Sequence, residues 1–251
     1  MGGMRALSES KSATGRSGHA VLPAVPVDVQ VVRGHVLDFA QCQEGSRVVQ
    51  DAFERSSQDV RVELAGELMG HVLETSRSKH GNYVVAAVVA LLTPQQAAFI
   101  AAEVSKDTVD AAKHRFACRI VCRLLEFATN QEHCISIADE IADNAVALSI
   151  HPFANYVVST CFEHAGTRRR RRILEAIRTE LSACMESRNG RRVIEYCLRY
   201  ATAEDGVATI FFELLRVPAH SAGKIKTDAL MRVCTKPGLA HCVVPDYRKD
   251  I

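Results

Sequence analysis

The chain of 251 residues has little net charge and no long apolar segment. Its 31 basic and 29 acidic residues give a formal charge of +2, which excludes a protein that holds nucleic acid mainly by bulk charge. The longest unbroken apolar run, residues 83–92, stops at Thr93-Pro94 after about half of the ~20 residues that a membrane-spanning helix needs. We therefore expect no membrane span, and any anionic partner must be held by local features.

Motifs of catalytic and metal sites are also missing. The sequence has no nucleophile elbow, Gly-rich phosphate loop or HExxH pair, so we expect no enzymatic activity and no cofactor. Cys118 and Cys122 belong to a repeat described below, and neither they nor Cys234, His241 and Cys242 have the spacing of a zinc site. Nine cysteines without a secretory hydrophobic segment favour reduced thiols in the cytosol or nucleus.

Residues 1–32 are rich in Gly, Ser and Pro and lack sustained periodicity. This composition is typical of mobile chain, and we predict a mobile leader over this range. Its serine and basic residues leave a transit peptide as the alternative. For the protein as a whole we expect a cytoplasmic location, with the nucleus or nucleolus as alternatives.

One short phrase returns five times beyond the leader. It consists of a small residue, Gly or Ala, followed by five residues that we number as positions 1 to 5. The copies lie at residues 45–50, 81–86, 117–122, 154–159 and 190–195, in steps of 36 or 37 residues. A second phrase, Gly-His-Val-Leu, keeps the same register at 34–37 and 70–73. We therefore predict five repeats over residues 33–215 and a degenerate sixth repeat or C-terminal cap over 216–251.

The repeats favour an all-α fold. Each period holds two apolar stretches with helical spacing, such as 68–76 and 82–92, and no alternating run indicates a strand. Paired helices with a period of about 36 residues predict a right-handed α-solenoid. On a helix, positions 3 and 4 fall on one side and positions 1, 2 and 5 on the other. Positions 3 and 4 are apolar in every repeat, so we expect them in the core.

Position 2 alternates between arginine and tyrosine. Along the chain it is Arg47, Tyr83, Arg119, Tyr156 and Arg192. Each side chain ends in a flat group, and the same placement in successive repeats would align these groups along one face. Unstacked bases can stack on such groups with about 1–3 kcal/mol each. Positions 1 and 5 lie one turn apart on the same face, where they could contact the edge of a base.

The phrases GSRVVQ, HGNYVVA, FACRIVC and FANYVVS resemble those of the Pumilio (PUF) family of single-stranded RNA-binding solenoids. The resemblance covers residues 34 to about 210. It implies a monomer that binds single-stranded RNA on a concave face, in a messenger 3′ untranslated region or in ribosomal RNA, and acts in post-transcriptional control. It also implies a convex face open to protein partners. Members usually have eight repeats, whereas five are recognisable here.

The resemblance assigns positions 1 and 5 to the edges of the bases. Ser46 and Gln50 form the one complete pair, which resembles a pair that selects adenine. The other repeats depart from the family's pattern, with Asn82 and Ala86, Cys118 and Cys122, Asn155 and Ser159, and Arg191 and Glu195. Ala86 cannot form a hydrogen bond to a base, and Arg191 could pair with Glu195 on its own helix. We therefore expect RNA binding with reduced base specificity.

A run of five arginines allows three interpretations. Arg168, Arg169, Arg170, Arg171 and Arg172 precede an apolar-periodic stretch. They could form the solvated first turn of a helix, contact phosphates or act as a nuclear localisation signal. For the whole protein, two alternatives to message binding stay open. These are an RNA-maturation factor of ribosome biogenesis with non-specific RNA binding, and a helical-repeat scaffold that binds proteins and no RNA.

Overall fold

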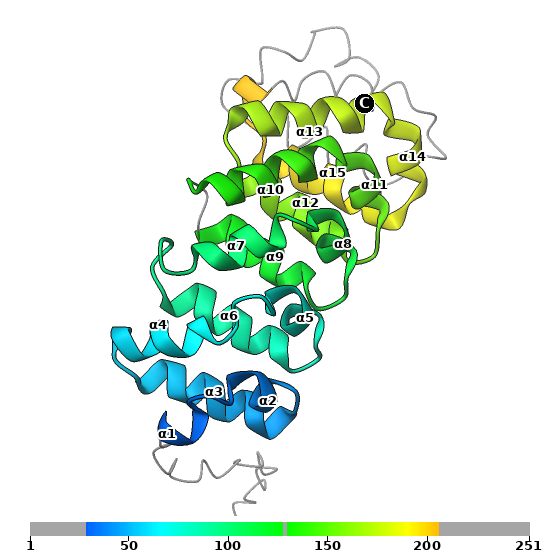
Figure 1. Ribbon diagram of the computed structural model, residues 1–251. Coiled ribbons are helices and arrows are strands. Elements are labelled where there is room, and N and C mark those ends of the chain that lie inside the picture. Colours follow the sequence, from blue (N-terminus) through cyan, green and yellow to red (C-terminus); the bar gives the residue numbers. More distant parts are fainter. Residues whose placement is uncertain (1–28, 128–129, 206–251) are drawn as a thin grey trace, which may run out of the picture.

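The computed structural model describes residues 29–127 and 130–205, and every regular element in these two ranges is a helix (Figure 1). Residues 1–28 of the predicted leader lie outside the described residues, whereas residues 29–32 form helix α1 (Val29–Val32). The predicted sixth repeat or cap, residues 216–251, also lies outside them. None of the described helices combines the length and the apolar character that crossing a bilayer requires.

Three helices, rather than the expected two, make up the repeating unit. A short helix precedes an inner helix that carries the five-residue phrase, and an outer helix follows. The short helices are α2 (Val36–Ala40), α5 (Val72–Arg77), α8 (Thr108–Lys113), α11 (Ala145–Ile150) and α14 (Leu181–Glu186). The inner helices are α3 (Gln43–Arg55), α6 (Gly81–Leu91), α9 (Cys118–Phe127), α12 (Ala154–His164) and α15 (Arg188–Tyr200). The outer helices are α4 (Gln58–Gly66), α7 (Ala98–Val104), α10 (Glu132–Asp143) and α13 (Thr167–Thr179), and a 3-10 turn, η1 (Ala203–Asp205), follows α15.

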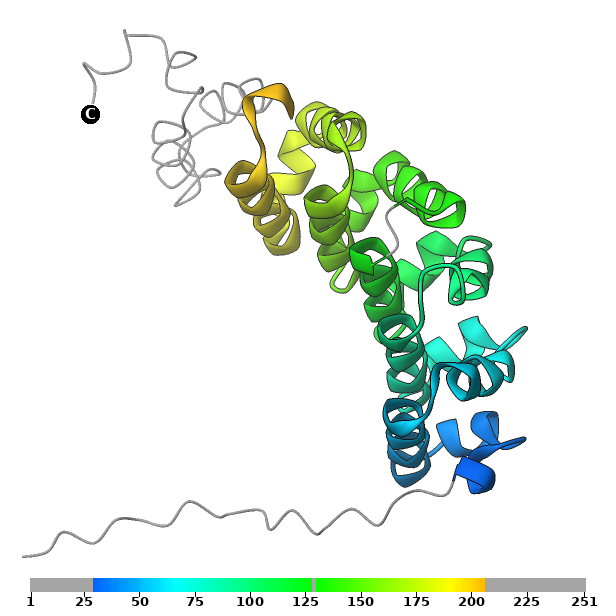
Figure 2. The ribbon, with the colours of Figure 1, turned by 90° about the vertical axis from the view of Figure 1, so that its left-hand side faces the viewer.

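The helices are stacked in a curved solenoid. Each inner helix packs against the next, from α3 through α15, while α10 in the outer row packs against both α7 and α13. Figure 2 shows that the inner row forms the concave side of the curve and that the outer helices lie behind it. This arrangement confirms the predicted α-solenoid and gives the inner helices one common exposed face.

Positions 3 and 4 of the phrase hold the inner row in place. They are at most 1% exposed in the four later repeats, at Val84, Val85, Ile120, Val121, Val157, Val158, Val193 and Ile194. In the first repeat Val49 is buried, whereas Val48 is half-buried at the end of the described stack. β-branched residues are mediocre helix formers, so tertiary burial of these pairs stabilises the inner helices. It also leaves position 2 on the opposite, concave side.

The small residue before position 1 lets the inner helix approach the short helix closely. A Cβ atom on Gly45 would overlap the carbonyl oxygen of Phe39, and one on Gly190 would overlap that of Cys184. The predicted close backbone contact is therefore confirmed at these two glycines. A larger residue would displace the start of the inner helix, which carries the exposed position 2.

In each of the first two repeats a glutamate joins the end of the repeat to its beginning. Glu67, which follows the outer helix α4, accepts hydrogen bonds from the backbone N–H groups of Gly34 (2.8 Å) and Val36 (2.9 Å), at the start of the same repeat. Glu103 makes the same two contacts one repeat later, with Gly70 (2.6 Å) and Val72 (3.0 Å). Gly34 and Gly70 have φ angles of +76° and +83°, a conformation that residues with a Cβ rarely adopt. The phrase Gly-His-Val-Leu thus marks a turn whose amides bind a glutamate at the end of the same repeat.

Candidate nucleic-acid interface

The five side chains at position 2 lie exposed on successive inner helices. Arg47, Tyr83, Arg119, Tyr156 and Arg192 come from α3, α6, α9, α12 and α15, respectively. The two tyrosine residues are 48% and 50% exposed, although large aromatic residues usually lie mostly buried. The expected row of flat side chains therefore exists on the concave face. We call these five residues the position-2 column.

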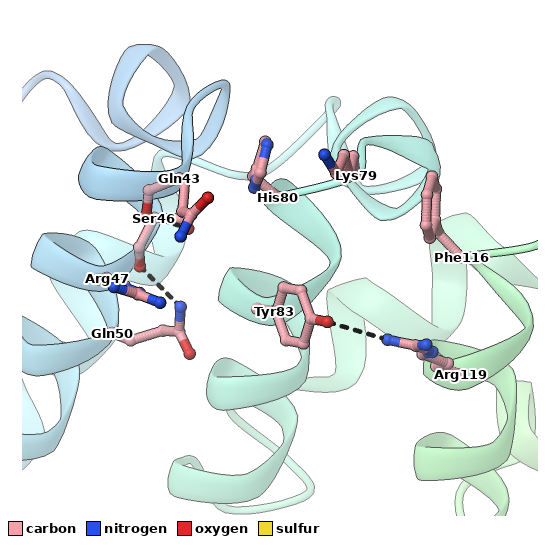
Figure 3. Close-up of a pocket in the computed structure, with 9 residues that line it drawn as sticks. All are labelled: Gln43, Ser46, Arg47, Gln50, Lys79, His80, Tyr83, Phe116 and Arg119. Carbon is pink, nitrogen blue, oxygen red and sulfur yellow. Dashed lines mark hydrogen bonds between the residues drawn. The ribbon is translucent and has the colours of Figure 1, made fainter. Parts of the chain in front are cut away.

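Three hollows lie along the column. The first has a volume of about 440 Å³ and collects residues of three repeats (Figure 3). It is lined by Gln43, Ser46, Arg47, Gln50, Lys79, His80, Tyr83, Phe116 and Arg119. Positions 1, 2 and 5 of the first repeat thus share one hollow with position 2 of the next two. The predicted grouping of these positions on one face is confirmed here.

The second and third hollows repeat this grouping further along. The second, of about 630 Å³, is lined by Arg115, Phe116, Cys118, Arg119, Cys122, Arg123, Glu126, Phe153 and Tyr156. The third, of about 620 Å³, is lined by Tyr156, Arg188, Asn189, Arg191, Arg192 and Glu195. Each hollow therefore combines positions 1, 2 and 5 of one repeat with position 2 of a neighbour. Cations outnumber carboxylates in both linings.

Both tyrosines of the column contact the arginine of the following repeat. Arg119 donates a hydrogen bond from Nη1 to the Tyr83 hydroxyl at 3.2 Å, and its guanidinium carbon lies 5.8 Å from the ring centroid. Arg192 makes the same two contacts with Tyr156: the hydrogen bond from Nη1 to the hydroxyl is 2.7 Å long, and the guanidinium carbon lies 4.8 Å from the ring centroid. These distances fall in the range of cation–π interactions. The column is therefore held together by two pairs of adjacent members.

Position 1 is less accessible than the helical geometry predicted. Ser46, Asn82, Cys118 and Asn155 are between 1% and 8% exposed. The amide of Asn82 donates to the carbonyls of Ser78 and Lys79, both at 2.9 Å. Asn155 makes equivalent bonds one turn before α12. These four residues are largely buried because the short helix of each repeat packs against the start of its inner helix, and their predicted contact with base edges stays a prediction.

Position 5 also bonds within its own helix. Gln50 donates to the carbonyl of Ser46 at 2.8 Å, and Ser159 donates to that of Asn155 at 3.0 Å. Burial raises the pKa of the Cys122 thiol to about 12, which keeps it neutral. The pKa of Cys118 is raised by the same cause.

In the fifth repeat, position 1 also bonds elsewhere than expected. Arg191 donates to the carbonyl of Met185 at 2.7 Å. The backbone there lies at the end of α14, within reach of the long side chain. The predicted contact partner, Glu195, is half-buried and lines the third hollow.

The arginine run lies in the outer row and not on the concave face. On α13, Arg169 binds both carboxylate oxygens of Asp139, at 3.0 and 2.8 Å, and Arg172 contacts Asp139 at 2.5 Å and also Asp143. The hydrogen bond from Arg169 holds the pKa of Asp139 below its usual value.

The other arginines of the run are bound or lie apart from the hollows. Arg170 donates to the carbonyl of Glu163 at 2.7 Å, and Arg171 to that of Glu204 at 2.7 Å. Arg168 is exposed on the same outer helix. The run thus lies behind the inner row, and most of its members are bound to neighbouring acidic or carbonyl groups. The phosphate-contact interpretation of Arg168, Arg169, Arg170, Arg171 and Arg172 stays a prediction.

A different set of cations was not predicted from the sequence. Lys79, Arg115 and Arg188 each lie four residues before position 2 and line the three hollows. We call these three residues the basic row. Each stands at the first residue of its inner helix or in the turn before it, so the fixed spacing of four residues from the position-2 column was the signal that could have revealed them. Arg123, four residues after Arg119, lines the second hollow as well.

Comparison with known proteins places the repeats in a family. A profile described as the Pumilio-family RNA binding repeat matches five times, at residues 35–69, 71–105, 108–142, 144–178 and 187–215, which together exceed half of the chain. Pumilio homolog 11 of Arabidopsis thaliana is 27% identical over 159 residues, which are 62% of this chain and 28% of that protein. Pumilio homolog 12 of the same plant is 26% identical over 171 residues, 67% of this chain and 28% of that protein. The chain thus spans less than a third of the length of these curated relatives.

Solved structures share the fold. The structure of PUF-8 in complex with PBE-RNA superposes with a TM-score of 0.77 and 18% identity, covering 88% of this chain and 68% of that one. The Puf3 RNA binding domain bound to the Cox17 RNA 3′ UTR recognition sequence, site B, superposes with a TM-score of 0.71 and 18% identity. This match covers 89% of this chain and 70% of that one. The repeat matches and the solenoid therefore agree: the chain belongs to the Pumilio family.

Proposed function

We propose that this protein binds single-stranded RNA on its concave face and acts in post-transcriptional control. The observation that carries the proposal is the position-2 column, in which five flat side chains lie exposed in one row above cationic hollows. Aromatic rings and guanidinium groups are the surfaces on which unpaired bases stack. The solved relative Puf3, bound to a 3′ UTR sequence, supports messenger 3′ untranslated regions as the class of RNA.

The proposal includes weak discrimination between bases. Polar groups that read the edge of a base must be free to bond with it. Here the side chains at positions 1 and 5 bond mostly to the backbone around them, as at Asn82 and Ser159. Even Ser46 and Gln50, the complete pair, use their donor groups on Gln43 and Ser46 carbonyls. RNA would have to replace these bonds, which removes much of the gain from reading an edge.

The basic row supplies contacts that do not depend on sequence. Lys79, Arg115 and Arg188 flank the column at the start of the inner helices of repeats 2, 3 and 5 and can bind the phosphates of a strand that runs along it. We propose that these three residues, rather than the arginines of α13, provide the phosphate contacts.

Fluorescence anisotropy with a labelled pool of random RNA decamers tests the function. The double variant Tyr83→Ala/Tyr156→Ala should lose about 2–6 kcal/mol of binding free energy, because two stacking surfaces are removed. Tyr200→Ala is the matched control, since Tyr200 is 41% exposed on α15 but lines none of the three hollows. Equal affinity of the double variant and wild type would contradict base stacking, and the absence of RNA binding by both would favour a protein-binding scaffold.

A further inference from the structure

We propose that the position-2 column takes up bases in alternate gaps. This inference rests on the proposed RNA binding. A gap is the space between the position-2 side chains of adjacent repeats. The gaps between repeats 1 and 2 and between repeats 3 and 4 are open, whereas those between 2 and 3 and between 4 and 5 are closed by Tyr–Arg pairs.

The distances within the pairs leave no room for a base. Stacked bases are spaced about 3.4 Å apart, so two flat groups with a base between them must lie about 7 Å apart. The guanidinium carbon of Arg119 is 5.8 Å from the centroid of the Tyr83 ring, and that of Arg192 is 4.8 Å from Tyr156. Because the separation of two parallel planes cannot exceed the distance between their centres, both gaps are too narrow. They must widen by at least about 1 and 2 Å, respectively, before a base enters.

The other two gaps contain hollows instead of contacts. Arg47 and Tyr83 line the first hollow, and Arg119 and Tyr156 line the second. Within the described residues, no hydrogen bond or cation–π contact joins the members of either couple. Figure 3 shows this contrast, with Tyr83 bonded to Arg119 on one side while Arg47 lies on the other side without a bond to it.

The third hollow is consistent with this pattern. Tyr156 and Arg192 both line it, together with Arg188 and Glu195. Since Tyr156 and Arg192 are in direct contact, they form one wall of this hollow and not two facing walls. A base that enters it can lie against the pair but not between its members.

The repeat geometry itself generates the alternation. In both closed gaps the arginine contacts the tyrosine that lies 36 residues before it. The same contact in two separate places argues for a built feature, because each pair forms from equivalent positions on equivalent helices. Since arginine and tyrosine alternate along the column, an arginine that contacts the preceding tyrosine closes every second gap. The bound strand would therefore insert bases at two separated gaps, with the nucleotides between them turned away from the column.

Removing the tyrosine hydroxyl tests the inference, because it weakens the pair and keeps the ring. We expect Tyr83→Phe and Tyr156→Phe each to bind the random decamer pool about two- to tenfold more tightly than wild type, because without this hydrogen bond the closed gap opens at a lower cost and can take up a further base. The double variant should show the product of the two factors. Tyr200→Phe, with a hydroxyl outside the hollows, is the matched control and should bind like wild type.

Whether RNA affinity rises or falls in the Phe variants separates a failure of the alternate gaps from a failure of RNA binding itself. Unchanged or weaker binding by both Phe variants, with Tyr83→Ala/Tyr156→Ala still impaired, would overturn the alternate gaps and leave the proposed RNA binding intact. Absence of binding by wild type and by all variants would overturn both proposals. Circular dichroism establishes whether each variant keeps its helix content, so a loss of fold is not mistaken for a loss of affinity.

Discussion

Arginines of the inner and outer rows have opposite environments. On α13, Arg169 and Arg172 hold Asp139 of the preceding repeat, 30 and 33 residues away in the sequence. On the inner row, Arg115 and Arg188 line open hollows. The outer arginines thus stabilise the joint between repeats 3 and 4, whereas the inner ones are available to an anionic partner. A dense cluster of arginines in the sequence is therefore a poor guide to the binding face, because distant carboxylates decide which of them remain available.

The strongest test of this comparison removes the basic row. Lys79→Ala/Arg115→Ala/Arg188→Ala should weaken RNA binding about 100-fold at 0.1 M salt, because each phosphate contact on a single strand contributes about 0.7 to the salt slope. The slope of log K against log salt concentration should fall by about 2. Anisotropy titrations between about 0.05 and 0.2 M salt measure both quantities.

The matched control removes outer arginines instead. Arg168→Ala/Arg171→Ala takes two exposed cations from α13, and it should leave the salt slope unchanged. If the salt slope of this variant fell as much as that of Lys79→Ala/Arg115→Ala/Arg188→Ala, the proposed difference between the inner and outer arginines would be wrong. The phosphates would then lie along α13.

The second prediction concerns stability and not affinity. Asp139→Asn should lower the free energy of unfolding by about 2 kcal/mol, since it removes the charge that Arg169 and Arg172 share and leaves Arg169, whose side chain is 18% exposed, without its ion pair. RNA affinity at a temperature where the variant is folded should be unchanged. Urea unfolding followed by circular dichroism measures the first effect. A variant with normal stability but weaker RNA binding would assign α13 to the RNA and contradict its structural role.

The features encoded within one repeat could be predicted from the sequence. The period, the helical fold and the exposed position-2 column follow from spacing alone, because the same helix geometry applies to every copy. Features that depend on contacts with another helix could not be predicted from the sequence. Asn82 is buried because α5 covers the start of α6, and Arg169 is paired because a carboxylate 30 residues earlier lies beside it. The third helix of each repeat was missed because each period showed only two apolar stretches with helical spacing, the second of which ends at Thr93-Pro94, whereas α7 begins after this turn.

The basic row lies between the features that the sequence predicts and those that it does not. Lys79 and Arg188 stand in the sequence at a fixed spacing from the column, but the run on α13 is the denser cluster of cations. Their significance depends on what surrounds them, which is the hollow that the fold creates between inner helices. Local spacing identifies candidates, and the stacking of repeats selects among them.

The smallest expected effect distinguishes repeats within the inner row. In repeats 3 and 4, the Nδ1 atoms of His114 and His151 accept backbone N–H bonds at 3.3 to 3.4 Å just before the inner helix. In repeats 2 and 5, the hydroxyls of Ser78 and Ser187 do the same. A protonated imidazole cannot accept these bonds, so only the histidine repeats should respond to acid.

The direction of the pH effect follows from the lowered pKa values. Burial, with the cations Arg77 and Arg115 as further causes, lowers the pKa of His114, and burial with Lys113 lowers that of His151. Folding therefore favours the neutral form. Its stabilising contribution is complete above the ordinary pKa of 6.5 and is lost as the pH falls below that value. Thermal unfolding of wild type should accordingly shift to lower temperature between about pH 7.5 and pH 5.

Serine at both positions should remove this part of the acid sensitivity. His114→Ser/His151→Ser copies the residue that repeats 2 and 5 already use, so the turn keeps an acceptor whose bonds do not depend on protonation in this range. The difference in melting temperature between about pH 7.5 and pH 5 should be smaller in the double variant than in wild type. Ser78→Ala/Ser187→Ala is the control, because it weakens the same turns without changing a titrating group and should lower the melting temperature equally at both pH values. An equal acid shift in wild type and the histidine variant would show that carboxylates, such as those bound by the arginines of the outer row, account for the pH dependence of the solenoid.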